Sequence, residues 1–144
     1  MLTIRFIKLR EGAQIPRKAH EDDAGFDLYA SENFTLKAHG FGCVPTAIAM
    51  ELPAGYEAQV RPRSGLAAKH GVTVLNAPGT IDAGYRGEVK VILINHGEED
   101  FSITAGMRIA QLIPSPVIPA VFEEVTALDD SDRGAGGFGS SGTN

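Results

Sequence analysis

Glycine and proline recur along the whole chain, and their spacing limits the fold more than any other feature. The sequence has 17 glycines and 8 prolines among 144 residues, and they interrupt it at short intervals. Both residue types favour turns, and proline is excluded from helix interiors and central strands. The stretches between them are short and apolar or alternating, as in Leu2–Phe6. We therefore expect an all-β sandwich or barrel of short strands.

The strands can be located from their apolar patterns. Glu88–Asn95 begins in alternation and ends in a continuous apolar run, which predicts a central strand whose second half is covered on both faces. One short helix is expected over Arg63–Gly71, with Ser64 as its N-cap and Gly71 as its left-handed stop. The other candidate strands are Leu2–Phe6, Val44–Met50, Glu57–Arg61, Val72–Leu75, Phe101–Ile103, Arg108–Ile113 and Ala120–Val125.

Composition excludes several classes of protein. Cys43 is the single cysteine, so no intrachain disulfide can form, and it is expected in the core rather than as a nucleophile. The formal net charge of −5 argues against a nucleic-acid polymer as the main partner. No apolar run approaches the roughly 18 residues of a membrane span, and no targeting segment is seen. We expect a cytoplasmic protein with no membrane partner.

The start of the expected helix is the first candidate site. Its free backbone N–H groups, the Ser64 hydroxyl and the guanidinium groups of Arg61 and Arg63 could converge on one phosphate. The alternative is a two-turn connector in which Ser64 only caps the helix and the arginines are solvated. The segment by itself does not decide between these two interpretations.

The second candidate site is the glycine-rich loop Asn76–Gly87, between the expected strands Val72–Leu75 and Glu88–Asn95. Asp82 and Tyr85 lie near its tip. A loop aspartate usually caps a turn and a loop tyrosine usually packs against its surroundings. Together, in a loop whose glycines let a ligand approach the backbone, they indicate a pocket.

The third candidate is the terminal segment Arg133–Asn144. It contains the pattern G-x-G-x-x-G, but no strand precedes it and no helix follows, so it is not a dinucleotide-binding motif. Its composition indicates a flexible tail. Arg133 and Phe138 suggest a mobile arm that closes over a ligand, with Phe138 stacked on a planar base and Arg133 paired with a phosphate.

Five blocks of this sequence, in order, resemble the five motifs of the trimeric deoxyuridine triphosphatases, or dUTPases. The resemblance covers the chain nearly end to end, and five motifs with short spacers make it specific. The arm has Ser141 where the family usually has threonine, and the hydroxyl is retained. The blocks are Ala24–Ala30, Arg63–Ala67, Gly79–Gly87, Gly106–Leu112 and Arg133–Gly142.

The resemblance implies a jelly-roll-like β fold and a homotrimer with active sites shared between subunits. Residues 1–132 would form a single β domain, and residues 133–144 an arm that closes over a neighbour's site. The implied reaction is Mg²⁺-dependent hydrolysis of dUTP to dUMP and pyrophosphate, which limits uracil in DNA and supplies dUMP for thymidylate synthesis.

The resemblance also assigns roles in catalysis. Asp82 would accept the proton of the water that attacks the α-phosphorus. Ser64 would hydrogen-bond near the departing pyrophosphate, with Arg63 and the Gly65 N–H close by. Asp27 would hold Mg²⁺ through water, the metal resting mainly on substrate phosphates, and Gln111 would orient a metal-bound water or a phosphate oxygen.

The same resemblance places the base and the sugar. Backbone groups around Thr80, Ile81 and Lys90, with the Asn76 amide, would satisfy the hydrogen-bonding edge of uracil, and Tyr85 would pack under the deoxyribose. The arm residues expected at the substrate are Arg133, Phe138, Gly139 and Ser140.

Two other functions remain open. The related dCTP deaminases share the fold and part of the phosphate motifs, but they lack the glycine-rich arm. A jelly-roll protein could also sense dUTP without cleaving it, although every proposed catalytic position is filled here.

Overall fold

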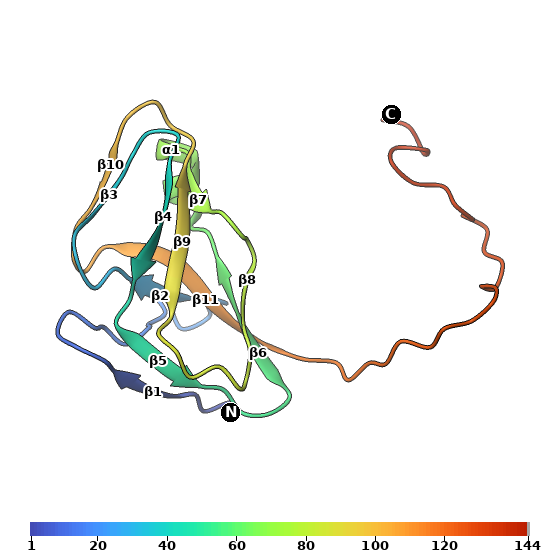
Figure 1. Ribbon diagram of the computed structural model, residues 1–144, viewed down its shortest axis with the longest axis horizontal. Helices are drawn as coiled ribbons and strands as arrows, with labels where there is room; N and C mark the ends of the chain where they lie inside the picture. Colours follow the sequence, from blue (N-terminus) through green and yellow to red (C-terminus); the bar gives the residue numbers. More distant parts are fainter. Residues whose placement is uncertain (144) are drawn as a thin grey trace.

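The computed structural model describes residues 1–143, and strands dominate it (Figure 1). All strand pairs are antiparallel, and the four sheets have the orders β1–β5, β3–β10, β2–β11–β6–β8 and β4–β9–β7. The predicted all-β architecture with one short helix is confirmed for the described chain. The elements are β1 (Arg5–Lys8), β2 (Phe26–Tyr29), β3 (Phe34–Leu36), β4 (Phe41–Pro45), β5 (Ile48–Glu51), β6 (Tyr56–Arg61), α1 (Ser64–His70), β7 (Val72–Val74), β8 (Gly79–Ile81), β9 (Lys90–Asn95), β10 (Phe101–Ile103) and β11 (Arg108–Pro116).

The core is built from alternate residues of the strands, as expected where one face of a sheet packs inward. In β9, Val91 and Leu93 are buried while Ile92 and Ile94 are only partly covered. β9 is the central strand of its sheet, as predicted. The prediction that both faces of its second half are covered is not met within one chain.

The expected strand Val44–Met50 is broken in two, which corrects the sequence-based prediction. Ala47 adopts a left-handed backbone with a φ of 58° and is fully buried. Its N–H donates to the Glu88 carboxylate at 2.8 Å, and the Thr46 hydroxyl donates to the Val89 carbonyl oxygen. The chain therefore turns between β4 and β5 to meet residues that are distant in sequence.

Glu88 supplies a stability prediction. Replacing Glu88 with alanine removes the acceptor of the buried Ala47 N–H and of Arg10, whose guanidinium lies 2.7 Å away, so unfolding should become easier by about 1–3 kcal/mol at neutral pH. The hydrogen bond from Arg10 lowers the pKa of Glu88 below its usual 4.5, and the Ala47 N–H adds to this shift. A carboxyl with a lowered folded-state pKa stabilises the fold above its unfolded pKa, and that stabilisation is lost as pH falls through the folded value.

Urea unfolding of the parent and Glu88→Ala at pH 7 and at acidic pH tests this linkage. The stability difference between the two proteins should shrink on acidification. A difference that stays constant across that range would contradict the assigned role of the charged carboxylate.

The expected strand Ala120–Val125 is absent, which also corrects the sequence-based prediction. β11 ends at Pro116, and the chain then runs away from the body of the molecule (Figure 1). Val121 and Phe122 are exposed, because no strand within residues 1–143 lies beside them. Cys43 is also exposed rather than in the core. Within residues 1–143, no helix is long and apolar enough to cross a membrane.

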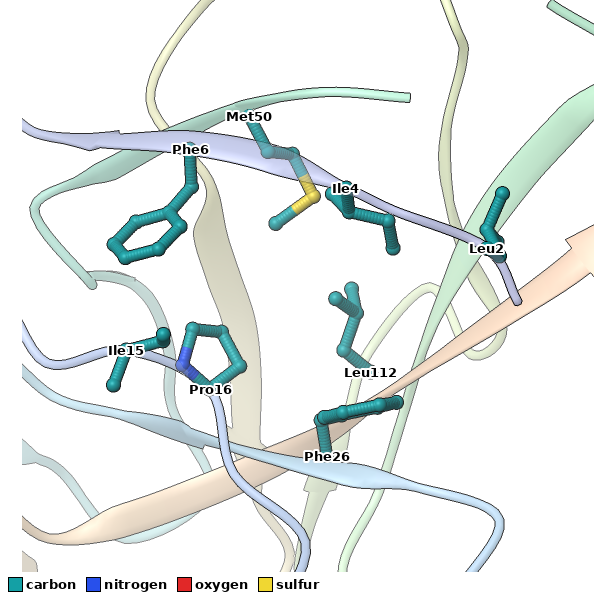
Figure 2. A pocket seen from close by; sticks show the side chains of 8 residues that line it. All are labelled: Leu2, Ile4, Phe6, Ile15, Pro16, Phe26, Met50 and Leu112. Atoms are coloured by element: carbon teal, nitrogen blue, oxygen red, sulfur yellow. The ribbon is translucent and has the colours of Figure 1, made fainter. Parts of the chain in front are cut away.

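An apolar pocket of about 200 Å³ lies under the β1–β5 pair. In Figure 2, Leu2, Ile4 and Phe6 on one side face Phe26 and Leu112 across it. A side-chain-lined space of this kind is a place where packing inside one chain is incomplete. The full lining is Leu2, Ile4, Phe6, Ile15, Pro16, Phe26, Met50 and Leu112.

Candidate active site

The register of three neighbouring strands brings the main polar residues together. Asp27 of β2 lies opposite Gln111 of β11, which lies opposite Arg61 of β6. A polar pocket of about 350 Å³ opens beside this row. Its lining is Ala19, Asp23, Ala24, Gly25, Asp27, Arg63, Ser64, Gly65 and Gln111.

Gln111 is held in one orientation at the wall of the pocket. Its side-chain Nε2 donates to the Pro62 carbonyl oxygen at 2.9 Å, so its Oε1 is available as an acceptor. A Cβ on Gly25 would overlap that oxygen, so a larger residue at this position would have to displace the Gln111 side chain. The lack of a side chain at Gly25 therefore allows the residues before β2 to approach Gln111 closely.

Asp27 is paired with two arginines. Its side chain is 14% exposed, its Oδ1 lies 3.3 Å from Arg63 Nε, and its Oδ2 lies 3.3 Å from Arg108 Nη1. Arg108 was not predicted as a site residue, although it stands in the fourth motif block. Its place within that block, at the start of the expected strand Arg108–Ile113, was the available signal. Two guanidinium groups at one pocket favour an anionic ligand.

Ser64 does not cap the helix, which corrects that prediction. Arg63 occupies the N-cap position of α1, with extended backbone angles and no side-chain capping hydrogen bond. Gly71 ends the helix with a φ of 65°, as predicted. The Ser64 hydroxyl is therefore not engaged in capping and lies at the pocket wall with Gly65. Arg61, by contrast, donates to the Gln59 side chain and is not among the lining residues.

The second candidate site forms a separate hairpin. β8 pairs with β6 on one side and forms the edge of its sheet, so its other edge leaves backbone groups free for a ligand. Thr80 is exposed and Ile81 is buried in β8, while Asn76 before it and Lys90 at the start of β9 are exposed.

Asp82 and Tyr85 form a turn directly after β8. The Tyr85 N–H donates to the Asp82 carbonyl oxygen at 3.0 Å, and the Tyr85 hydroxyl donates to the Glu88 carbonyl oxygen at 2.9 Å. A Cβ on Gly87 would overlap the Tyr85 ring, so a larger residue there would displace the ring from this position. Both Asp82 and Tyr85 are exposed to solvent.

This turn is distant from the polar pocket of the same chain. Asp82 follows Ile81, which lies opposite Ala58 of β6, whereas Asp27 lies in the row of Arg61, three residues further along β6. The offset is roughly 10 Å along the strands, and β6 and β11 add roughly 14 Å across them. One chain therefore does not place Asp82, the expected proton acceptor, at its own polar pocket.

Comparison with known proteins places this arrangement in a family. A dUTPase family model matches residues 11–142. The chain belongs to the dUTPase family. Relatives named deoxyuridine 5'-triphosphate nucleotidohydrolase from Clostridium acetobutylicum and Gloeothece citriformis are 56% and 53% identical to it, over 99% and 98% of this chain and 98% and 97% of their own lengths. This membership classes the chain as an enzyme, a dUTP diphosphatase.

Solved structures support the same family. The Staphylococcus bacteriophage 80alpha dUTPase with dUPNHPP superimposes on this dUTPase with a TM-score of 0.91 at 28% identity, covering 98% of this chain and 99% of that one. The expected jelly-roll-like fold is thereby confirmed.

The C-terminal arm of this dUTPase makes its described hydrogen bonds within itself and with the adjoining Ser131. Arg133 Nε donates to the Gly136 carbonyl oxygen at 2.7 Å, and successive backbone turns follow, including Ser140 N–H to the Gly137 carbonyl oxygen. Phe138 is fully exposed. Figure 1 shows the arm lying well away from the strands, so it does not cover the polar pocket of its own chain. Asn144, the last residue of the expected arm, lies outside the described residues.

The polar pocket suits a magnesium ion held mainly by substrate. No group of three or more His, Cys, Asp or Glu side chains suited to a metal occurs in residues 1–143. Asp27 and the Gln111 amide oxygen instead offer oxygen acceptors beside cationic groups. Mg²⁺ retains several waters and takes phosphate oxygens readily, so this donor set fits an ion bound through water.

Proposed function

We propose that this dUTPase hydrolyses dUTP to dUMP and pyrophosphate by attack of water on the α-phosphorus, with Mg²⁺ bound to the phosphates. The consequence would be less uracil in DNA and a supply of dUMP for thymidylate synthesis. The observation that carries the proposal is the polar pocket in which Arg63, Ser64 and Gln111 converge beside Asp27. Its groups match the charge and hydrogen-bonding needs of a triphosphate.

The pocket residues have distinct roles in the proposed reaction. Arg63 and the Gly65 N–H bind phosphate oxygens, and the uncapped Ser64 hydroxyl donates to the leaving pyrophosphate as its charge grows. Asp27 would hold Mg²⁺ through water and Gln111 would orient a metal-bound water or a phosphate oxygen, and the ion would supply charge neutralisation on the phosphates. Asp82 accepts the proton of the attacking water.

The segment around β8 and the turn after it selects the base and the sugar. Uracil presents an acceptor-donor-acceptor edge, which the free edge of β8 around Thr80 and Ile81, the backbone at Lys90 and the Asn76 amide can match. Cytosine reverses two of these groups and leaves buried partners unpaired, so discrimination should be on the order of a thousandfold. Tyr85, anchored to the Glu88 carbonyl oxygen, packs under the deoxyribose and excludes a ribose 2′-hydroxyl.

We propose a homotrimer whose active sites combine residues of different subunits. A general base must be within hydrogen-bond reach of its proton, and Asp82 is far from the polar pocket of its own chain. The apolar pocket of Figure 2 and the exposed apolar residues after Pro116, among them Val121 and Phe122, are surfaces that subunit contacts would bury.

The arm completes the site in this proposal. Residues 1–132 form one β domain, and residues 133–144 close over a neighbour's nucleotide. Phe138 stacks on the base, Arg133 pairs with phosphate, and backbone N–H groups at Gly139 and Ser140 cradle phosphate oxygens. The exposure of Phe138 in a single chain supports a partner outside that chain.

The direct test is pyrophosphate release from dUTP with Mg²⁺, compared with dCTP, dTTP and UTP. We expect turnover of dUTP alone at low enzyme concentration. Tight binding of dUTP without pyrophosphate release would support a nucleotide sensor instead, and ammonia release from dCTP would support a deaminase.

A further inference from the structure

Arg86 holds in place the turn that carries Asp82. Arg86 Nη1 donates to the Ala83 carbonyl oxygen at 2.6 Å and to the Tyr85 carbonyl oxygen at 3.2 Å. The guanidinium group therefore folds back over the turn and binds two of its peptide groups. Gly84, within the turn, has open space on its side-chain face, so packing there adds no restraint.

Arg86 also ties the turn to the body of the protein. Its Nη2 lies 3.4 Å from Glu51 Oε1, at the end of β5. The other carboxylate oxygen of Glu51 is paired with Arg5 of β1. Glu51 is partly buried at the edge of a sheet, so it offers a fixed point on regular structure rather than on another loop.

The far side of the turn has an independent anchor. Tyr85 is fixed through its hydroxyl to the Glu88 carbonyl oxygen, with Gly87 beneath its ring. The Tyr85 N–H holds the Asp82 carbonyl oxygen, but the next carbonyl oxygen along the turn, that of Ala83, is not bonded by Tyr85. Among the described hydrogen bonds, the one to the Ala83 carbonyl oxygen comes from Arg86.

We propose that Arg86 is a positioning residue for dUTP hydrolysis, acting through the Asp82 turn that it fastens to Glu51. The inference rests on the proposed function, in which Asp82 accepts the proton of the attacking water. The guanidinium fork fixes the Ala83 peptide and thereby the direction in which the Asp82 side chain leaves the backbone. The Tyr85 ring is anchored separately through its hydroxyl, and β8 is paired with β6, so nucleotide binding does not require the bond to Ala83.

Loss of Arg86 should have different effects on the reaction rate and on folding stability. The Arg86 and Glu51 side chains are 55% and 39% exposed, and ion pairs exposed to this extent contribute little to folding stability. A displacement of a catalytic group by about 1 Å can cost up to roughly 100-fold in rate. Loss of Arg86 should therefore affect catalysis much more than folding.

The test compares Arg86→Ala and Arg86→Lys with Arg5→Ala as the matched control. Arg5 shares Glu51 but does not touch the turn. We expect kcat of Arg86→Ala to fall by about tenfold or more, with KM, the Kd for dUPNHPP and the melting temperature close to the parent values. Lysine can donate to the Ala83 carbonyl oxygen but lacks the fork, so Arg86→Lys should recover part of kcat. Arg5→Ala should match the parent.

Three results would overturn the role of Arg86. They are a kcat of Arg86→Ala within twofold of the parent, a loss of activity that follows an equal loss of thermal stability, or a rise in the dUPNHPP Kd that accounts for the whole effect. Absence of dUTP hydrolysis by the unchanged protein would instead overturn the proposed function itself.

Discussion

Replacing Asp82 with asparagine should lower kcat for dUTP hydrolysis by about 10²–10⁴-fold, the range observed when a general base is removed. Asparagine has nearly the same shape but no basic oxygen, so the attacking water keeps its proton. The side chain is exposed and has no hydrogen-bond partner among the described contacts, so its loss should not disturb the fold.

Pyrophosphate release and calorimetric binding of dUPNHPP measure the two consequences separately. The Kd should change little, because the polar pocket and the β8 edge are intact. Asp129→Asn, another exposed aspartate outside the proposed site, is the matched control and should retain full activity. An Asp82→Asn protein with parental kcat would remove Asp82 from the mechanism.

Ending the chain at Asp132 should also abolish most activity without unfolding the protein. The missing arm carries Phe138, whose stacking on a base is worth about 1–3 kcal/mol, and Arg133, whose charged hydrogen bonds are worth about 1.5–3 kcal/mol. A combined loss of about 3–4 kcal/mol corresponds to roughly 10²–10³-fold in kcat/KM. The arm makes no described hydrogen bond to β1–β11, so circular dichroism and the oligomeric state should be unchanged.

Mixing the two defective proteins tests whether sites are shared. The truncated chain keeps Asp82, and the full-length Asp82→Asn chain keeps the arm. If different subunits supply these parts, trimers reassembled from both chains should regain activity that neither parent assembly has. If one chain supplies both parts, mixing should restore nothing, and full activity of the truncated protein alone would remove the proposed lid.

Local patterns were enough to predict much of the fold. Helix α1 and its stop at Gly71 follow from local propensities, and β6, β7, β9 and β10 fall where alternation placed them. The break at Ala47 could not be predicted, because its cause is Glu88, which is 41 residues away in sequence. Ala120–Val125 has the pattern of a strand, but a strand also needs a neighbour, and the described part of the chain provides none.

Individual residues of the site were predicted, but their arrangement in space was not. The motif blocks named Asp27, Ser64 and Gln111, which the register of β2, β6 and β11 does bring to one pocket. Arg108 was missed because its closeness to Asp27 results from the pairing of β2 with β11, which the sequence does not show. The distance between Asp82 and that pocket likewise depends on strand order, which spacing in the sequence does not contain.

The two arginines on Asp27 bear on how a triphosphate enters. Without nucleotide, the Asp27 carboxylate pairs with both guanidinium groups and keeps these two like charges close together. In the proposed reaction, incoming phosphate oxygens would replace the carboxylate as the partner of these arginines. One ionic partner would then be exchanged for another, and the reorganisation on binding would be small.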